Sequence, residues 1–333
     1  MIRTENSNKT FDVIIPLGPE DVGFLPRVID FLFRCIKGIR FVYIITATTN
    51  IVKLNDRLSK YDKCKLIDEN TLVTDLSYQR VNSLLKQYAP DRVGRTGWYL
   101  QQFLKMGFAK TVLSDSYYLS WDSDTLPLAP IAFFDEDKIL YNPKYEYNPN
   151  YFVSIKRLIG IDKMCERSFI SESMMFSAVY MRELIEKIEK SDVKGDDWIE
   201  KIIAAGDYAN PLPAFSEFET YGNYCMAYHP GVYKPRHLNT FREAGFIAGR
   251  NISEKILREM SFDLDIVSFE LFHQPAFPYN LPYIVRKAVK MWKKIFCMGI
   301  LGFVVNLASL QKQNNSAGII EKRKVKYRLP GGG

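Results

Sequence analysis

Short apolar runs alternate with helical patterns through the first 120 residues. Residues 11–17 (FDVIIPL) and 41–48 (FVYIITAT) are rich in β-branched residues and have the length of strands, and residues 22–36 between them carry apolar side chains at helical spacing. The pattern continues with strands expected at 65–68 and 116–121 and helices at 75–88 and 97–110. Strands that alternate with helices form a parallel sheet covered by helices. We therefore predict an α/β fold with a mostly parallel, doubly wound sheet of Rossmann type.

The alternation weakens in the second half of the chain. The Pro-, Asn- and Tyr-rich stretch 142–151 is typical of a loop, and residues 169–179 are expected to form a strand beside another strand. Helices are expected at 181–190, at 197–205 and from near Ser216 onward. Ser216 suits a helix N-cap, and Glu219 follows it at the spacing of a capping box. We expect one large domain over residues 11–285, preceded by a polar segment at 1–10.

The charge of the chain is uneven. The 45 Lys and Arg against 38 Asp and Glu give a net charge of +7, which suits a polyanionic ligand, a nucleotide or an anionic membrane surface without choosing among them. Residues 286–328 hold eleven basic residues and one acid, so the tail supplies the excess. The first ten residues lack the apolar core of an export signal, and the five cysteines show no paired spacing. We expect a cytoplasmic protein and no nucleic-acid partner.

Two aspartates follow the predicted strand at 116–121. Asp122 and Asp124, in the sequence WDSD, lie where that strand ends. Ligands of open parallel sheets bind beyond the carboxyl ends of the strands, and Mg²⁺ is commonly held by one or two carboxylates together with substrate phosphates. The alternative is a plain turn, in which the carboxylates satisfy local backbone groups. The pair by itself leaves both interpretations open.

Five segments in succession carry a family resemblance. They are VIIPLG, RTGWYLQQFLKMGFA, YYLSWDSDTLPLAP, SFISESMMFS and FSEFETYGNY. Over about residues 11–275 the chain resembles poorly characterised bacterial glycosyltransferases of the GT-A fold that share a Gly-Trp-x-x-Gln-Gln helix, an Asp-x-Asp and a Ser-Glu-x-Glu-x-Tyr-Gly segment. The resemblance implies a nucleotide-binding half over about 11–130 and an acceptor half over about 131–285. It also implies Mn²⁺ or Mg²⁺ as cofactor.

By this resemblance, the donor nucleotide lies at the ends of the first two strands. Pro16, Leu17 and Gly18 line it at the first strand. Thr46 and Thr48, at the end of the second strand, contact the base or ribose or serve only as strand-end hydroxyls.

The helix at 97–110 is expected to face the donor phosphates. Cationic and amide side chains there neutralise or bind phosphate oxygens, unless they form an ordinary solvated helix face. These residues are Arg95, Gln101, Gln102 and Lys105, whereas Trp98 and Tyr99 are expected in the core.

Asp122 and Asp124 are the metal ligands that the resemblance implies, with Asp122 also close to the donor. GT-A enzymes often add one late histidine, for which His237 and His273 are the candidates. The alternative for each is a structural histidine. 

Three glutamates are candidates for the chemistry of an inverting transfer. Such a transfer needs a carboxylate that accepts the proton of the acceptor hydroxyl as the new C–O bond forms. We prefer Glu217 for this role, because Glu219 is explained by a capping box. Glu172 is the third option, either binding acceptor hydroxyls or pairing with an arginine.

The segment 286–329 is expected to form a basic amphipathic helical extension. Its Lys and Arg, together with Trp292 and Phe296, are typical of a helix that lies in the interface of an anionic membrane. The alternative is a helix packed on the domain. The longest apolar run, 295–305, is too short to span a bilayer, and residues 330–333 are excluded from the fold as a cloning remnant.

The leading functional prediction is a metal-dependent glycosyltransferase that uses a nucleotide-sugar donor and a saccharide or lipid-linked saccharide acceptor in the synthesis of a bacterial surface glycan. One alternative is a nucleotidyltransferase of sugar activation. That class usually has a Gly-rich, basic loop after its first strand, which PLGPEDVG does not provide. The other alternative is a non-catalytic carbohydrate-binding protein.

Overall fold

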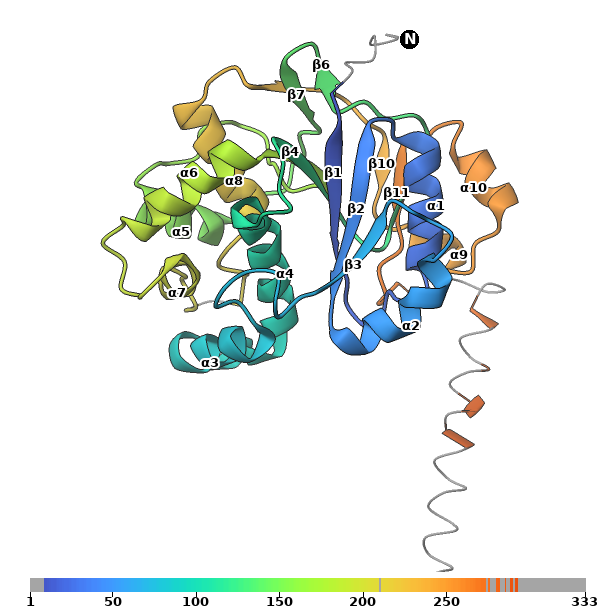
Figure 1. The fold of residues 1–333 in the computed structure, drawn as a ribbon, viewed down its shortest axis with the longest axis horizontal. Coiled ribbons are helices and arrows are strands. Elements are labelled where there is room, and N and C mark those ends of the chain that lie inside the picture. The colour runs from blue at the N-terminus through green and yellow to red at the C-terminus, as the bar shows by residue number, and fades with distance from the viewer. Residues whose placement is uncertain are drawn as a thin grey trace, which may run out of the picture. The chain divides into compact units, whose positions relative to one another are not determined.

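The computed structural model describes residues 9–209 and 211–273 and the isolated positions 275, 280, 281, 285, 288, 289, 291 and 292. Its central sheet has five strands in the order β3-β2-β1-β4-β8 (Figure 1). They are β3 (Cys64–Asp68), β2 (Ile39–Thr46), β1 (Phe11–Pro16), β4 (Tyr117–Trp121) and β8 (Ser173–Ser177). The first four pair in parallel and β8 runs antiparallel to β4. The predicted mostly parallel α/β sheet is confirmed.

The central strand β1 is buried along its whole length. A strand covered on both faces has an almost continuous apolar sequence, and FDVIIP has one charged residue, Asp12. The carboxylate of Asp12 is fully buried and accepts a hydrogen bond of 2.9 Å from Arg40 Nε on β2. This ion pair lies near the start of β1 and leaves the other end of the strand to the site described below.

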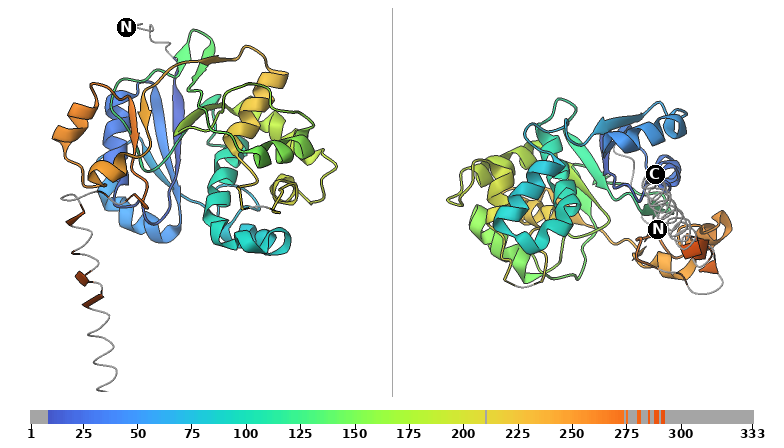
Figure 2. Two further views of the ribbon diagram at one scale, coloured as in Figure 1. Left: turned by 180° about the vertical axis from the view of Figure 1, so that it is seen from behind. Right: turned by 90° about the horizontal axis from the view of Figure 1, so that it is seen from below.

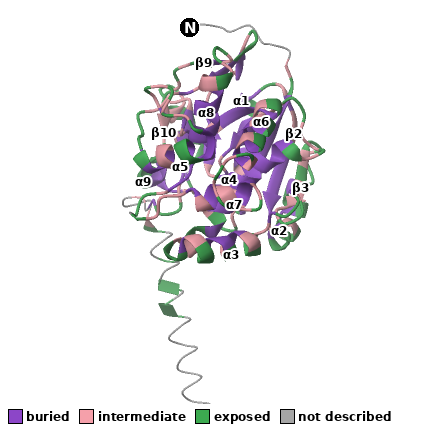
Figure 3. Ribbon diagram, turned by 90° about the vertical axis from the view of Figure 1, so that its left-hand side faces the viewer, coloured by how far each residue is buried: buried purple, intermediate pink, exposed green. Residues whose placement is uncertain are grey.

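Helices cover both faces of the sheet (Figures 1 and 2). One side carries α1 (Leu25–Cys35) and α2 (Thr48–Leu58). The other carries α3 (Tyr78–Tyr88), α4 (Thr96–Gly107), α5 (Pro149–Ile159), α6 (Ala178–Glu189), α7 (Trp198–Ala204) and α8 (Glu217–Tyr228), with the 3₁₀ turns η1 (Pro90–Arg95) and η2 (Phe108–Lys110) flanking α4. The buried residues gather along the sheet and the inward helix faces (Figure 3).

Two small sheets complete this part of the chain, together with α9 (Ala244–Ala248) and α10 (Glu254–Met260). One has the order β10 (Thr240–Phe241), β11 (Ile266–Ser268) and β5 (Thr125–Pro127), and the other β6 (Phe134–Asp135), β7 (Lys138–Tyr141) and β9 (Tyr233–Pro235). Strand β5 begins directly after Asp124 and pairs antiparallel with β11, Thr125 opposite Ser268. This pairing fixes the chain directly after residues 122–124, which we call the aspartate turn.

The predicted helix starts are partly confirmed. Ser216 caps α8, its Oγ accepting a hydrogen bond of 3.3 Å from the Glu219 N–H.

Helix α2 was not predicted, because its buried residues are few and include a polar one. The prediction of a loop over 142–151 is wrong at its end. Asn148 caps α5 and Pro149 occupies the first helical turn, a position that proline favours.

Strand β8 is also shorter than predicted. The expected strand at 169–179 contains β8 only at its centre, and Ala178 already begins α6.

The described residues 9–209 and 211–273 belong to one compact unit. The expected basic extension at 286–329 lies outside the described residues apart from isolated positions. Within the described part of the chain, no helix combines the length and the apolar character needed to cross a membrane.

Candidate functional site

A cavity of about 430 Å³ opens where β1 and β4 end. Pro16 is the last residue of β1, and the Asp122 turn follows β4 directly, so the cavity lies at the carboxyl edge of the parallel strands. This is the place where open α/β sheets bind ligands. Nine of the residues predicted for the site line it: Pro16, Arg95, Gln101, Gln102, Lys105, Asp122, Asp124, Glu172 and Glu217.

Helix α4 presents one face to the cavity. Trp98, Gln101, Gln102 and Lys105 all line it, and their spacing of i, i+3, i+4 and i+7 places them on the same side of a helix. Trp98, expected in the core, is only half-buried and so contributes an aromatic surface to the site. The neighbouring Tyr99 is buried, as expected.

Lys105 joins two carboxylates of the cavity. Its Nζ lies 3.2 Å from Asp122 Oδ1 and 3.0 Å from Glu217 Oε1, and it also lies 4.5 Å from the centre of the Phe218 ring. Burial by itself lowers the pKa of Lys105, but Asp122 and Glu217 together outweigh burial and raise this pKa above its ordinary value. Lys105 is therefore a fixed positive charge between the turn after β4 and the start of α8.

Gln102 has one satisfied and one unsatisfied end. Its Oε1 accepts a hydrogen bond of 3.2 Å from the backbone N–H of Glu217, which fixes the orientation of the amide. Its Nε2 is buried and has no hydrogen-bond partner among the described residues. Leaving a buried donor unpaired costs about 1–3 kcal/mol. A residue of this kind in a cavity wall is suited to donate to a bound ligand.

The aspartate turn is held by its backbone. The N–H of Thr125 donates to the Asp122 carbonyl at 3.2 Å, and the Asp122 N–H donates to the Glu172 carbonyl at 3.2 Å. The Asp124 carbonyl accepts from the N–H of Phe269 at 2.9 Å. The main-chain bonds close the turn, and both carboxylates line the cavity, where Asp122 Oδ1 contacts Lys105 and Asp124 Oδ1 accepts a hydrogen bond of 3.2 Å from Thr125 Oγ1. The turn that was one of the two interpretations is thus present, and its side chains also line the cavity.

Asp124 lies in an acidic environment. Burial raises the pKa of its carboxyl to about 7, and Asp122, Asp21 and Glu270 act in the same direction, whereas Arg250 opposes them. Arg250 is itself engaged, with its Nη1 2.6 Å from Asp21 Oδ1.

The residues at the turn fit a hard divalent cation. Oxygen ligands and an excess of negative charge are what Mg²⁺ and Mn²⁺ favour. In residues 9–209 and 211–273, no three His, Cys, Asp or Glu side chains are grouped to hold a metal ion. Asp122 and Asp124, together with Asp21 and Glu270, supply the carboxylate oxygens of this part of the cavity, and a cation held there would need further oxygens such as those of a substrate.

The three candidate glutamates occupy different surroundings. Glu217 and Glu172 line the cavity, and Glu172 pairs with Lys144, at 3.1 Å, and not with an arginine. Glu219 is buried away from the cavity and accepts hydrogen bonds from Ser168 Oγ, from the Phe169 N–H at 3.3 Å and from Asn223 Nδ2 at 3.0 Å. Its carboxylate ties α8 to the segment before β8, so only the Ser216 half of the expected capping box forms.

Six other predicted residues do not line the cavity. Thr46 Oγ1 donates to the Leu17 carbonyl at 2.7 Å, and Thr48 Oγ1 donates to Asp68 on β3. The imidazole of His273 is buried against Phe246, with ring centres 4.1 Å apart. The six are Leu17, Gly18, Thr46, Thr48, His237 and His273.

Other residues that line the cavity were not predicted. Arg242 follows β10, and its guanidinium contacts Glu146 Oε2 at 3.2 Å and Glu270 Oε1 at 3.7 Å. Asp21 lies in the loop after β1. These residues come from loops far apart in the sequence, and each lacks a local motif that would mark it.

Several solved structures are similar to this chain at low identity. Mouse xyloside xylosyltransferase 1 matches with a TM-score of 0.44 and 13% identity, over 80% of this chain and 99% of that chain. The galactosyltransferase LgtC, solved with donor and acceptor sugar analogues, matches with a TM-score of 0.36 and 13% identity, over 78% of this chain and 87% of that chain. WbbM, a bifunctional glycosyltransferase, matches with a TM-score of 0.40 and 10% identity, over 80% of this chain but only 46% of its own. Likenesses at these scores do not define a shared activity.

A second comparison concerns sequence families. No curated protein matches the chain. A protein-family model, described as a family of unknown function (DUF6492), matches residues 10–248. These residues include β1, the α4 face, the Asp122 turn and the start of α8. Because the match extends over most of the chain, the protein belongs to this family of unknown function.

Proposed function

We propose that the protein is a metal-dependent glycosyltransferase that moves a sugar from a nucleotide-sugar donor to a saccharide acceptor. The observation that carries this proposal is the composition of one cavity at the carboxyl edge of the sheet. The lining of this cavity combines the acidic turn, Asp122 to Asp124, with the cation of Lys105, which contacts Asp122, and the unpaired amide donor of Gln102. A diphosphate with a divalent cation is a ligand that uses all three.

Asp122 and Asp124 would hold Mn²⁺ or Mg²⁺, which when bound supplies charge neutralisation to the donor diphosphate. The roles of the other residues do not involve the metal. Lys105 holds the Asp122 carboxylate in place at 3.2 Å and brings a positive charge into the cavity. Gln102 Nε2 donates to an oxygen of the donor, and the exposed Arg95 adds a second cation at the cavity wall. These contacts orient the donor with its sugar toward α8.

Glu217 is our candidate for the general base of an inverting transfer. It is the first residue of α8, its backbone N–H is bound to Gln102 and its Oε1 is 3.0 Å from Lys105 Nζ, so the carboxylate is held in the cavity wall. The acceptor hydroxyl would give its proton to this carboxylate as the C–O bond to the sugar forms. Glu172 also lines the cavity and is the second candidate for this role.

We further propose, from the sequence of residues 286–310, that the protein contacts an anionic membrane peripherally and acts on lipid-linked acceptors of a surface glycan. Removal of residues 286–333 should weaken cosedimentation with vesicles containing anionic lipid, and the binding of the whole chain should fall steeply with salt. Equal binding of the truncated and whole chains would contradict this part of the proposal.

The activity is tested with a panel of nucleotide sugars in the presence and absence of Mn²⁺, with release of the nucleotide as the readout. We expect metal-dependent release for at least one donor. Asp124→Asn should abolish it, and Asp56→Asn, on the exposed side of α2, should not. Release that does not need metal, or that survives in Asp124→Asn, would contradict the assignment. Absence of release and transfer with every donor would favour a carbohydrate-binding protein.

A further inference from the structure

A second, larger cavity lies beside the first. It has a volume of about 870 Å³ and is formed by the loop after β7 and by the segment that connects β9 to β10. The charged and aromatic side chains that line it are Lys144, Tyr145, Arg167, Arg236, His237 and Asp263. We call this cavity the basic groove, because it contains three Lys or Arg against one carboxylate.

Two arginines of the basic groove have no carboxylate partner among the described residues. The guanidinium of Arg167 lies 3.6 Å from the centre of the Tyr145 ring. That of Arg236 lies 4.6 Å from the centre of the Phe133 ring, and its Nε is buried without a hydrogen bond. Burial lowers the pKa of Arg236 to about 10, against the opposing influence of Asp265, so the side chain is still charged at neutral pH. Both cations are thus positioned by aromatic rings and retain donors for a ligand.

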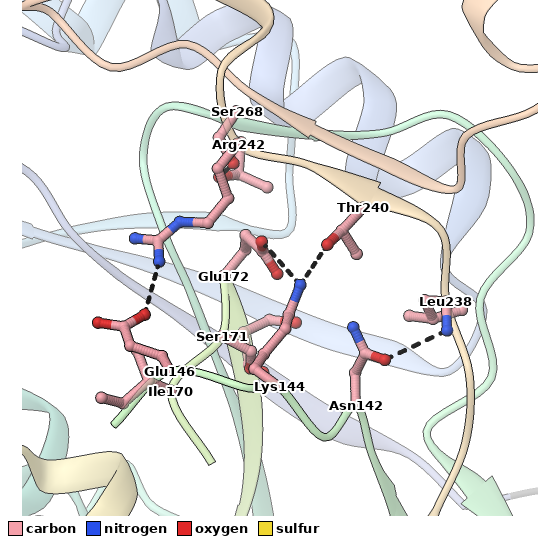
Figure 4. A network of polar contacts seen from close by, with 12 residues as sticks. Asn142, Lys144, Glu146, Ile170, Ser171, Glu172, Leu238, Thr240, Arg242 and Ser268 are labelled. Atoms are coloured by element: carbon pink, nitrogen blue, oxygen red, sulfur yellow. Dashed lines mark hydrogen bonds and ion pairs between the residues drawn. The ribbon is translucent and has the colours of Figure 1, made fainter. Parts of the chain in front are cut away.

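The wall between the basic groove and the first cavity is a short polar network (Figure 4). Lys144 Nζ contacts Glu172 Oε1, which lines the first cavity, at 3.1 Å, and it also donates to Thr240 Oγ1, which lines the groove. The pairing with Glu172 uses the charge of Lys144, which leaves the two arginines as the available cations. The groove is therefore adjacent to Glu172, the second candidate for the base, and opposite in charge to the aspartate turn.

We infer that the basic groove binds an anionic saccharide, with a carboxylate or phosphate group held by Arg167 and Arg236. This inference deepens the proposed function and rests on it for the identification of the saccharide as the acceptor. A planar guanidinium matches the two oxygens of a carboxylate or phosphate. The ring of Tyr145, 85% exposed, adds an apolar surface beside Arg167 for the sugar.

The test compares the binding of charged and neutral saccharides by calorimetry. Trigalacturonic acid is paired with maltotriose to test a carboxylate, and mannose 6-phosphate is paired with mannose to test a phosphate. We expect at least one anionic probe to bind about tenfold or more tighter than its neutral counterpart. The pair that shows the difference identifies the anionic group. Equal binding within both pairs would overturn the inference.

Substitutions of the two arginines test whether the anionic probe binds in the basic groove. Arg167→Gln should weaken the binding of the anionic probe about ten- to a hundredfold, as expected for the loss of a charge-assisted hydrogen bond. The affinity for the neutral probe should not change. Arg57→Gln, an exposed arginine of α2, is the matched control and should bind like the native protein. Arg236→Lys keeps the charge but loses the planar donors, and should weaken binding while the protein remains folded in a melting experiment. Native affinity in both groove variants would place the anion elsewhere.

The same proteins separate this inference from the proposed function. Binding of a nucleotide sugar with Mn²⁺ should be unaffected by Arg167→Gln, because Arg167 does not line the first cavity. If anionic probes bind in the groove but no donor binds or reacts, the proposed function fails and the groove remains an anion-binding site. If donors react but anionic probes show no preference, the groove inference fails and the function remains.

Discussion

Lys105 offers a quantitative test of the site, because its charge is buried between two carboxylates. The side chain of Lys105 is 10% exposed and that of Glu217 is 6% exposed, whereas Asp122 is 37% exposed. Lys105→Met removes the charge but keeps an unbranched side chain of similar length. The variant leaves the Glu217 carboxylate buried without its counter-charge. The free energy of unfolding should therefore fall.

The expected size follows from the geometry. At an effective dielectric constant of about 20, two unit charges separated by the 3.0 Å between Lys105 and Glu217 attract by about 5.5 kcal/mol, part of which is offset by the cost of removing both from water. Breaking a buried pair by removing one partner costs about 3–5 kcal/mol. Asp122, 3.2 Å from Lys105 and 37% exposed, adds a further attraction that solvent partly screens. The double variant Lys105→Met with Glu217→Gln has no unpaired buried charge, so its free energy of unfolding should be about 2 kcal/mol higher than that of Lys105→Met alone.

The measurement is a double-mutant cycle by urea unfolding of the four proteins. Lys110→Met is the matched control. Its ion pair with Glu189 is 3.2 Å long but exposed, and its removal should cost no more than about 1 kcal/mol. A coupling energy for Lys105 and Glu217 below about 0.5 kcal/mol, similar to that of an exposed pair, would refute the reasoning that this lysine is a fixed charge of the cavity.

Further predictions concern other residues of the same region. Glu217→Gln should lower turnover by at least about a hundredfold with donor binding intact, and normal turnover in this variant would show that another carboxylate is the base. Glu219→Gln should mainly lower the free energy of unfolding, by about 1–3 kcal/mol. Gln102→Leu should weaken donor binding about tenfold and lower the free energy of unfolding by about 1 kcal/mol, because the Glu217 N–H loses its acceptor; unchanged affinity in calorimetry would remove the role of Gln102 as a donor to the ligand. Gly222→Ala would place a Cβ against the ring of Phe169 and should destabilise α8 by about 1–3 kcal/mol. Gly97→Ala, which has open space in α4, should be neutral or stabilising. Equal melting temperatures of the two alanine variants would contradict this packing.

The central sheet was predictable because its strands are continuous apolar runs. β1 and β4 are buried on both faces and are recognisable by composition alone. Strands of two to four residues, such as β5 and β10, carry no periodic pattern and exist because they pair with β11. Helix α5 was missed for a local reason. Its Asn-Pro start occurs in a segment whose composition is otherwise typical of a loop.

The candidate site was predictable where it is local in sequence. Asp122 follows a strand, and Gln102 and Lys105 occupy one face of one helix, so spacing was sufficient to group them. The capping-box spacing favoured Glu217 over Glu219, but it did not reveal the contacts with Ser168 and Asn223 that hold the Glu219 carboxylate. Residues at i and i+2 point to different sides of a helix, and which side faces the cavity depends on how α8 packs. 

Asp21 and Arg242 reach the cavity from loops more than two hundred positions apart in the chain. Only the tertiary structure brings them together, so no local signal in the sequence marks either of them.

The central claim is that Asp122 and Asp124 bind a divalent cation together with the diphosphate of a nucleotide sugar. Its most direct test is calorimetric titration of the whole chain with nucleotide sugars, with and without Mn²⁺, for the native protein and Asp124→Asn. We predict that at least one nucleotide sugar binds the native protein only when Mn²⁺ is present, and that Asp124→Asn lacks this binding while it unfolds cooperatively at no lower temperature than the native protein. Binding that is equal with and without Mn²⁺, or equal in the two proteins, would contradict the claim.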